Sequence, residues 1–485
     1  MENPILDNLN ICVLAPMIIL CVGALSIICI DMLKRERSRS FYAILCIVFL
    51  LISTVAVVVL DNNTSGFFGM IKIDALAKIS QLIILSSCLL FAPLALSGKE
   101  FAEYRFAEYF AFILFVAAGF LFMVSTTNLI LIFIGLETAS LSLYAMIAMQ
   151  SKKNAIEAAL KYFTMGALSS GLFAFGAMIF YALSGSVDIT VIVERLSGRG
   201  FEPMLAILGA SAFLFASLAF KLSIIPFHTW TPDVYEGSSA SLAGFMSIVP
   251  KIAGFIVVIR MFEYMLHTVI WVEDMLYVLA VVTMTLSNLM ALVQSDVKRM
   301  LAFSSISHVG FVLCAVLIGG AYEAIFVYWI LFMFVNFGAF TMLWIARNKE
   351  NLYDERYQHP FKKFSGMIKV APMGAIIMAL FMLSLAGIPP FSIFWGKMYI
   401  MSVVINNGFI YLAIIMALNS AIAVYYYLKL IVYMFLQEPL SNDGTIYVEN
   451  TSKPLMVVVG IAAITAGAAI FLVEPIIGIV KYYLG

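Results

Sequence analysis

The stretch FKLSIIPFHTWTPDVYEG, residues 220–237, interrupts an apolar run with charged and helix-breaking residues. Lys221 comes five residues before Pro226, and His228 follows two residues after that proline. Proline has no amide N–H to donate, and its ring clashes with a carbonyl of the preceding turn. We therefore expect a helix that is broken at Pro226, with a lysine and a histidine beside the freed backbone groups.

The rest of the chain has the composition of a membrane protein. Of its 485 residues, 63% are hydrophobic and 12% are charged, and the mean hydropathy is +1.04. Soluble domains contain about 25% charged residues. Apolar runs of about 20 residues, long enough to cross the hydrocarbon core as helices, recur along the sequence. Lipid cannot satisfy free backbone groups, so each run predicts a helix.

We predict an all-α polytopic membrane protein with about 14 spans in one membrane domain, residues 1–485. Its expected parts are N-terminal helices (1–107), a first repeat (108–262), an inverted second repeat (270–436) and a C-terminal helix (437–485). The expected spans are 11–32, 42–60, 77–97, 108–124, 127–149, 155–184, 203–231, 239–262, 270–292, 300–319, 322–346, 369–403, 409–436 and 454–480.

Two of these spans have similar interruptions. Span seven contains IIPFHTW and span twelve contains GIPPFSIFW, so we expect broken helices at Pro226 and at Pro389–Pro390. The breaks are five spans apart, and an odd separation inverts the second copy relative to the first. Discontinuous helices in inverted repeats mark ion and substrate paths in transporters.

Basic residues predict how the chain crosses the membrane. Seventeen of the 28 Lys and Arg residues fall in loops on one side, and five fall on the other. Loops rich in Lys and Arg stay in the cytoplasm. Both termini are therefore expected on the opposite side, which is the periplasm in a bacterial inner membrane.

Several ionisable residues lie inside the expected spans, where a charge costs roughly 2.5–3.5 kcal/mol. Glu137, near the centre of span five, predicts a proton site paired with Lys221, or else a carboxyl bonded to neighbouring hydroxyls. Lys221 is the natural partner, unless its side chain reaches the cytoplasmic surface. Two further lysines allow the same two interpretations, a proton site or a structural lysine. They are Lys251, directly after Pro250, and Lys397, after the second break.

Other polar residues allow two interpretations each. His228 and His308 are suited to relay protons near neutral pH, or else they serve structure, with His228 capping the broken helix. Glu157 and Lys161 are four residues apart and share one helical face, as a surface ion pair or at a proton entrance. Arg260 is expected to anchor the outer interface.

The same sequence argues against several other classes of protein. Zero net charge gives no case for nucleic-acid binding, and no nucleotide-binding glycine motif stands at a strand–helix junction. The six cysteines all lie in apolar runs without CxxC spacing, which indicates small buried residues. The four histidines lack metal-ligand spacing, so no metal site is expected.

Four motifs together resemble the antiporter-like membrane subunits of respiratory complex I, the bacterial NADH:quinone oxidoreductase. They are FKLSIIPFHTWTPDVYEG, FMSIVPKIAGF, QSDVKRMLAFSSISHVGF and LAGIPPFSIFWGKMY. Their order spans nearly the whole chain. The TPDVYEG ending and the lysine in the twelfth span favour one branch of these subunits, because the sister subunits more often have an LPDAH form.

The resemblance implies roles for particular residues. Glu137 and Lys221 match the family's glutamate–lysine pair, Lys251 matches its connecting lysine, and Lys397 matches its terminal lysine. His228 and His308 match polar positions of the membrane axis less closely. The family fold of two inverted five-helix repeats with flanking helices agrees with the repeat described above.

The resemblance also implies a function and partners. We expect a non-redox, proton-translocating subunit in the bacterial inner membrane that couples quinone reduction to proton pumping. The subunit itself would hold no cofactor, whereas NADH, FMN, iron–sulfur clusters and quinone would bind partner subunits. Its partners would be sister antiporter-like subunits, small membrane subunits and lipids, and no nucleic acid. The alternatives are a subunit of an Mrp-type cation/proton antiporter or membrane-bound hydrogenase, and a structural membrane scaffold.

Overall fold

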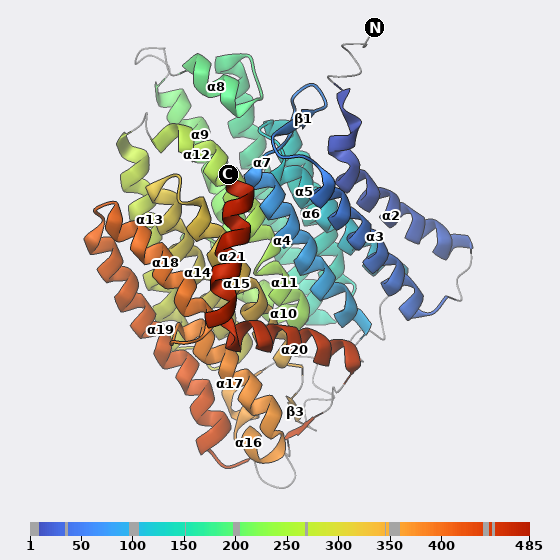
Figure 1. Ribbon diagram of the computed structural model, residues 1–485, viewed down its shortest axis with the longest axis vertical. Helices are drawn as coiled ribbons and strands as arrows, with labels where there is room; N and C mark the ends of the chain where they lie inside the picture. Colours follow the sequence, from blue (N-terminus) through green and yellow to red (C-terminus); the bar gives the residue numbers. More distant parts are fainter. Residues whose placement is uncertain are drawn as a thin grey trace.

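A computed structural model shows a bundle of long helices with two small strand pairs (Figure 1). The structure describes residues 9–33, 37–96, 106–150, 152–196, 204–266, 270–344, 346–348, 359–439, 446–448 and 452–485. The expected cytoplasmic loop 98–107 falls almost entirely outside these residues, and so does much of the loop 347–368.

Twelve helical stretches within the described residues are long and apolar enough to cross a bilayer. Their main helices are α2 (Ala15–Leu33), α3 (Arg39–Val59), α4 (Ala75–Phe91), α5 (Phe106–Val124), α6 (Leu129–Ala148), α7 (Lys153–Ser184), α9 (Met204–Leu222), α12 (Val249–Leu266), α13 (Ile270–Leu292), α14 (Val297–Ile318), α15 (Tyr322–Met342) and α19 (Ile410–Leu436).

Shorter elements complete the architecture. The helices are η1 (Ile11–Leu14), η2 (Ala92–Leu96), α8 (Ile189–Leu196), α10 (Trp230–Gly237), α11 (Ala240–Met246), η5 (Phe361–Phe364), α16 (Met367–Val370), α17 (Pro372–Ala386), α18 (Ser392–Asn406), α20 (Lys453–Gly467) and α21 (Ala469–Leu484). Strand β1 (Thr64–Gly66) pairs antiparallel with β2 (Ile71–Ile73), and β3 (Ala346–Asn348) pairs antiparallel with β4 (Ile446–Val448).

Polar side chains begin several of the long helices. Asp74 accepts a hydrogen bond from the Ala77 amide at 2.8 Å at the start of α4, and Asp296 accepts one from the Arg299 amide at 3.0 Å at the start of α14. Each carboxylate satisfies an amide that has no partner within its helix. These caps explain why the helices begin directly after an acidic residue in an otherwise apolar sequence.

The first expected break is confirmed, because α9 ends at Leu222 and α10 begins at Trp230. Ser223 has a left-handed backbone with φ 62°. Its amide donates to Phe220 O at 3.1 Å, and the Ile224 amide donates to Ala219 O at 2.9 Å. This pair of bonds closes a helix at a left-handed residue.

The second break is also confirmed and has the same hydrogen-bond pattern. Helix α17 ends at Ala386, and Gly387 follows with φ 83°. The Gly387 amide donates to Ser384 O at 2.9 Å, and the Ile388 amide donates to Leu383 O at 3.1 Å. In Figure 1, the α9–α10 pair descends while the α17–α18 pair ascends. The two breaks therefore lie on helices of opposite direction.

The C-terminal span differs from the expectation of one continuous helix over 454–480. Helices α20 and α21 meet at a bend of 91°, and α20 packs across α15. At 1.5 Å per residue, a straight helix over 453–484 would greatly exceed the ~30 Å hydrocarbon core. The bend shortens the segment, and the expectation of a straight fourteenth span was wrong.

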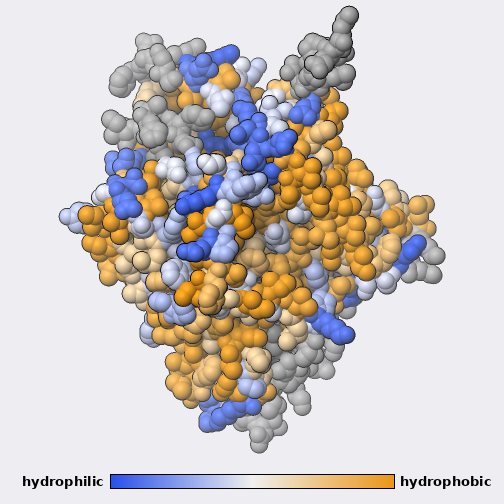
Figure 2. Space-filling model, in the orientation of Figure 1, coloured by the Kyte–Doolittle hydropathy of each residue, from blue (hydrophilic) through white to orange (hydrophobic). Residues whose placement is uncertain are grey.

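The surface is consistent with a membrane-embedded bundle. Apolar side chains cover most of the face shown in Figure 2, and hydrophilic residues gather mainly near its top and at its lower tip. In Figure 1, β1 and α8 lie at the top, while α16 and β3 lie at the opposite end. Elements beside loops that the basic residues assign to opposite sides of the membrane therefore lie at opposite ends of the bundle.

The orientation can be tested by cysteine labelling in intact cells. Asn62 and Lys362 are both exposed. The expected spans put Asn62 in the loop 61–76, outside the cytoplasm, and Lys362 in the loop 347–368, inside it. In a background with the exposed Cys12 and Cys29 replaced by serine, we expect an impermeant thiol reagent to label Asn62→Cys and not Lys362→Cys. Strong labelling of Lys362→Cys with none of Asn62→Cys would reverse the assigned orientation.

Candidate functional site

Lys221 lies in the last turn of α9, directly before the first break, and is 3% exposed. Its Nζ atom is 3.5 Å from the Tyr162 hydroxyl on α7. The same atom lies 5.0 Å from the centroid of the Tyr162 ring and 5.6 Å from that of Tyr144 on α6. The lysine therefore faces the helix bundle, and the interpretation that it reaches the surface was wrong.

Glu137 lies on α6, and its Oε1 atom accepts a hydrogen bond from the Ser170 hydroxyl on α7. Within the described part of the chain, no ion pair within 4.0 Å joins Glu137 to Lys221. The structure thus brings the two residues of the expected pair into neighbouring helices without a direct ion pair, and their pairing stays a prediction.

The alternative for Glu137, bonding to hydroxyls of its own helix, is also not what the structure shows. Thr138 and Ser142 donate at 2.8 Å to the carbonyls of Ile134 and Thr138, one turn earlier in α6. Such local bonds to the backbone are common for these residues within helices. The hydroxyl partner of the carboxylate comes from the neighbouring helix instead.

Lys251 lies on α12 and is 1% exposed. Its Nζ donates to the carbonyl oxygen of Ser305 on α14 at 2.8 Å, and it also bonds to the Ser305 hydroxyl. Both contacts place the ammonium inside the protein, away from lipid. A buried ammonium needs such acceptors, because it carries three donors and no acceptor of its own.

His308 lies one helical turn beyond Ser305 on α14 and is buried. Its two ring nitrogens bond to two tyrosines, Nδ1 to Tyr328 OH on α15 and Nε2 to Tyr427 OH on α19, the latter at 3.3 Å. Lys251 contacts Ser305 and Lys397 lies over the Phe311 ring, three residues to either side of His308 on α14.

Lys397 lies on α18, after the second break, and is 5% exposed. Its Nζ donates to Ala386 O at 3.2 Å and to Leu385 O at 3.4 Å. These carbonyls belong to the last turn of α17, where free carbonyls and the helix dipole favour a cation. The side chain also lies over the ring of Phe311 on α14, with Nζ 5.1 Å from the ring centroid.

The other predicted site residues have different surroundings. His228 is buried in the first break, and its Nδ1 has no hydrogen-bond partner among the residues that the structure describes. The structure thus assigns it no capping bond through that atom, and its relay role stays a prediction. Glu157 and Lys161 form an ion pair at 3.0 Å with both side chains about half exposed.

This ion pair is one part of a larger network at the end of the bundle where α7 begins. Lys161 also contacts Asp233 at 3.2 Å. Arg299 at the start of α14 bonds Asp233 at 2.8 Å and Glu236 at 2.6 Å. The network ties α10, the second half of the first broken span, to α7 and α14.

Arg260 differs from the expected interfacial anchor, because it is 8% exposed and paired inside the protein. Its guanidinium makes two hydrogen bonds of 2.7 Å to the Asp74 carboxylate. It also donates to Val124 O at 3.1 Å. The planar fork of arginine suits such a bidentate pair, which fastens the start of α4 to α12 and α5.

The tyrosines and serines beside the lysines were missed from the sequence. Tyr144, Tyr162 and Tyr427 lie in apolar runs, where an aromatic residue resembles ordinary packing surface. Ser170 and Ser305 are short polar residues of the kind that membrane helices often contain. Only the packing of α6, α7, α14 and α19 brings these hydroxyls to the ionisable groups.

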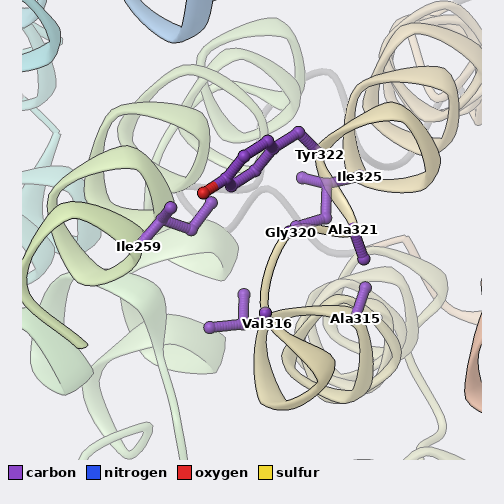
Figure 3. Close-up of a pocket in the computed structure, with 8 residues that line it drawn as sticks. Ile259, Ala315, Val316, Gly320, Ala321, Tyr322 and Ile325 are labelled. Atoms are coloured by element: carbon purple, nitrogen blue, oxygen red, sulfur yellow. The ribbon is translucent and has the colours of Figure 1, made fainter. Parts of the chain in front are cut away.

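One small pocket lies apart from these charges (Figure 3). It is lined by residues of the α14–α15 turn and the neighbouring helices, with Ile259 opposite Val316, Gly320 and Tyr322. Its walls are mostly apolar and contain none of the buried lysines. Among the residues that the structure describes, no group of three or more His, Cys, Asp or Glu side chains has the geometry to hold a metal ion.

Comparisons with known proteins agree with this geometry. The family described as "NADH:quinone oxidoreductase/Mrp antiporter, TM" matches residues 126–423. A protein of Sulfurovum sp. strain NBC37-1, named NADH-quinone oxidoreductase subunit N, is 53% identical over 99% of this chain and 98% of its own length. A protein of the same name from Sulfurimonas denitrificans is 54% identical over the same shares.

A solved structure has the same fold. A chain of respiratory complex I from Thermus thermophilus with bound aureothin matches with a TM-score of 0.79 and 27% identity, covering 96% of this chain and 98% of that one. Fold and buried lysines define an antiporter-like membrane subunit. The chain belongs to the NADH:quinone oxidoreductase/Mrp antiporter family, and its close relatives there are the proteins named NADH-quinone oxidoreductase subunit N.

The Asp74–Arg260 pair generates a stability prediction. Asp74→Ala leaves the Arg260 guanidinium buried without its counter-charge, and breaking a buried pair in this way costs about 3–5 kcal/mol. We expect the variant to lower the thermal midpoint of the purified protein sharply and to reduce its level in the membrane. Asp61→Ala, which removes an exposed carboxylate nearby, is the matched control and should leave both unchanged. Equal stability of the two variants would contradict the role of the pair.

Proposed function

We propose that this chain is a proton-translocating membrane subunit of a complex I-type NADH:quinone oxidoreductase. The observation that carries the proposal is the burial of Lys221, Lys251 and Lys397 in the bundle, together with Glu137. A charged residue in the membrane interior is costly and is retained where it serves a path for ions or protons. The close relatives named as subunits of this enzyme support the same assignment.

The proposed transfer moves one proton at a time and conserves charge. The ammonium of Lys221 becomes an amine as it releases a proton, and the amine of Lys251 becomes an ammonium as it takes one up. Lys251 then gives a proton to one ring nitrogen of His308 and returns to an amine. His308 releases a proton from its other ring nitrogen to the amine of Lys397, which becomes an ammonium. Hydroxyl groups such as those of Ser305 and Tyr427 lie on this route.

The switch proposed for the first step is the distance between Glu137 and Lys221. Opposite charges 4 Å apart interact by about 4 kcal/mol at an effective dielectric of 20. That energy is equivalent to about a thousandfold change in the equilibrium between the ammonium and the amine of Lys221. Moving the carboxylate toward or away from the lysine therefore decides whether Lys221 keeps its proton.

The electron-carrying chemistry belongs to other subunits in this proposal. NADH, FMN, iron–sulfur clusters and quinone would bind partner subunits, and this chain would act as a non-redox part of the enzyme. Sister antiporter-like subunits, small membrane subunits and lipids would surround it in the bacterial inner membrane, with both termini on the periplasmic side. The apolar surface of the bundle is consistent with such neighbours (Figure 2).

Substitutions of Lys221 test the proposal. In inverted vesicles that contain the assembled enzyme, Lys221→Ala should abolish most electron-driven acidification and reduce quinone-reductase turnover with it. Lys221→Arg keeps a charge but does not readily release a proton, so it should be impaired as well. Tyr425→Phe, on an exposed side chain of α19, is a control that should pump normally.

Three results would overturn the proposal in different ways. Normal pumping by Lys221→Ala and Lys251→Ala would favour a structural scaffold. Isolation of the chain in a complex without flavin and iron–sulfur subunits would favour an Mrp-type antiporter. Co-purification with a hydrogenase arm would assign the chain to a membrane-bound hydrogenase.

A further inference from the structure

We infer that Tyr144 and Tyr162 form an aromatic cage that holds the Lys221 ammonium while it is separated from Glu137. The inference deepens the proposed function and rests on it, since it assigns Lys221 a second resting partner. Both tyrosines are positioning residues that act through the lysine. The rings belong to α6 and α7, and the lysine belongs to the end of α9.

The distances support a cation held by ring faces. The Lys221 Nζ atom lies 5.0 Å from the Tyr162 centroid, 5.6 Å from the Tyr144 centroid and 6.0 Å from the Phe220 centroid. A cation within about 6 Å of an aromatic centroid is attracted by the negative face of the ring, and the attraction grows when water is excluded. Lys221 is almost fully buried, so this condition is met.

Hydrogen bonds alone do not satisfy the Lys221 ammonium. Its ammonium has three donors, and the one hydrogen-bond partner that the described structure gives it is the Tyr162 hydroxyl, at the long distance of 3.5 Å. Lys251 and Lys397, by contrast, each donate to backbone carbonyls. Aromatic faces thus occupy the place that carbonyls occupy around the other two lysines.

The two tyrosines are fixed by their own packing. Tyr162 stacks on Trp230 of α10 with centroids 4.4 Å apart and ring planes 7° apart. Tyr144 meets Tyr162 edge-on at 4.6 Å. Because Trp230 begins the second half of the broken span, a movement of α10 would be transmitted to the Tyr162 ring.

Gly166 makes the position of Tyr144 possible. A Cβ atom at residue 166 would lie 2.0 Å from the Tyr144 hydroxyl oxygen, which no side chain tolerates without moving. The Tyr144 hydroxyl is buried and has no hydrogen-bond partner in the described part of the chain. The ring is therefore held by packing against α7, and a methyl group at Gly166 would displace it.

The cage predicts how the pH dependence of pumping changes when a ring is lost. The ionisable side chains in contact with Lys221 are Tyr144 from α6 and Tyr162 from α7, and Glu137 also lies on α6. Helix α12 packs against α9 as well, but its Lys251 and Arg260 bond Ser305 and Asp74 instead. Without a ring face the ammonium is less favoured, so Lys221 loses its proton at a lower pH. Because water is excluded here, removing one ring should lower by about one unit the pH at which Lys221 loses its proton.

The test compares ring removal with hydroxyl removal in vesicles that contain the assembled enzyme. Tyr162→Leu and Tyr144→Leu should each lower by about one unit the pH at which acidification falls to half on the alkaline side. Tyr162→Phe and Tyr144→Phe keep the ring and should move the midpoint by less than the matching Leu variants. Tyr162→Phe loses only the long hydrogen bond to Lys221, and Tyr144→Phe loses a hydroxyl that has no hydrogen-bond partner in the described structure. A midpoint that moves equally in the Phe and Leu variants would overturn the cage in favour of a hydroxyl relay.

A second pair of variants tests the cage independently, in case the leucine variants misfold. Gly166→Ala should displace Tyr144 and lower the alkaline midpoint, whereas Gly171→Ala in the same helix meets nothing within 4 Å and should not. An unchanged midpoint in Gly166→Ala and both leucine variants would overturn the cage. If Lys221→Ala still abolishes pumping in that case, the proposed function stands without it.

Discussion

An ammonium group inside a membrane protein needs acceptors, and the second helix break of this chain supplies them to Lys397. At the second break, Lys397 donates to the carbonyls of Leu385 and Ala386, which have no partner within α17 once the helix has ended. The negative end of the helix dipole at the same place adds to the attraction. Lys397 therefore depends on the end of α17, whereas Lys251 uses Ser305 on the unbroken α14 and Lys221 uses the Tyr162 hydroxyl.

Much of this arrangement could be predicted from the sequence. The IIPFHTW and GIPPFSIFW stretches predicted both breaks, because proline and glycine act locally and leave a readable pattern. The inward position of Lys251 followed from the cost of facing lipid. The 91° bend between α20 and α21 was not predicted. Gly467 lies at the bend, but a single glycine in an apolar run does not by itself mark a break, and α20 packs against α15, which is distant in the sequence.

Pairing between distant elements was the least predictable part of the site. Arg260 was expected at the interface and instead binds Asp74, which lies 186 residues away. Glu137 binds Ser170 on another helix, although hydroxyls of its own helix lie closer in sequence. Helix-to-helix packing decides such contacts, and an apolar sequence contains little information about which faces meet. For the same reason the tyrosines around His308 and Lys221 looked like ordinary packing residues.

In the proposed mechanism, protons pass between the two broken spans through Lys251. The most direct measurement is the number of protons moved per electron by the purified enzyme in proteoliposomes, comparing wild type with Lys251→Met. Methionine is an unbranched side chain one atom shorter than lysine and removes the ionisable group. We expect fewer protons per electron, or loss of turnover together with pumping. An unchanged proton-to-electron ratio at unchanged turnover would contradict it.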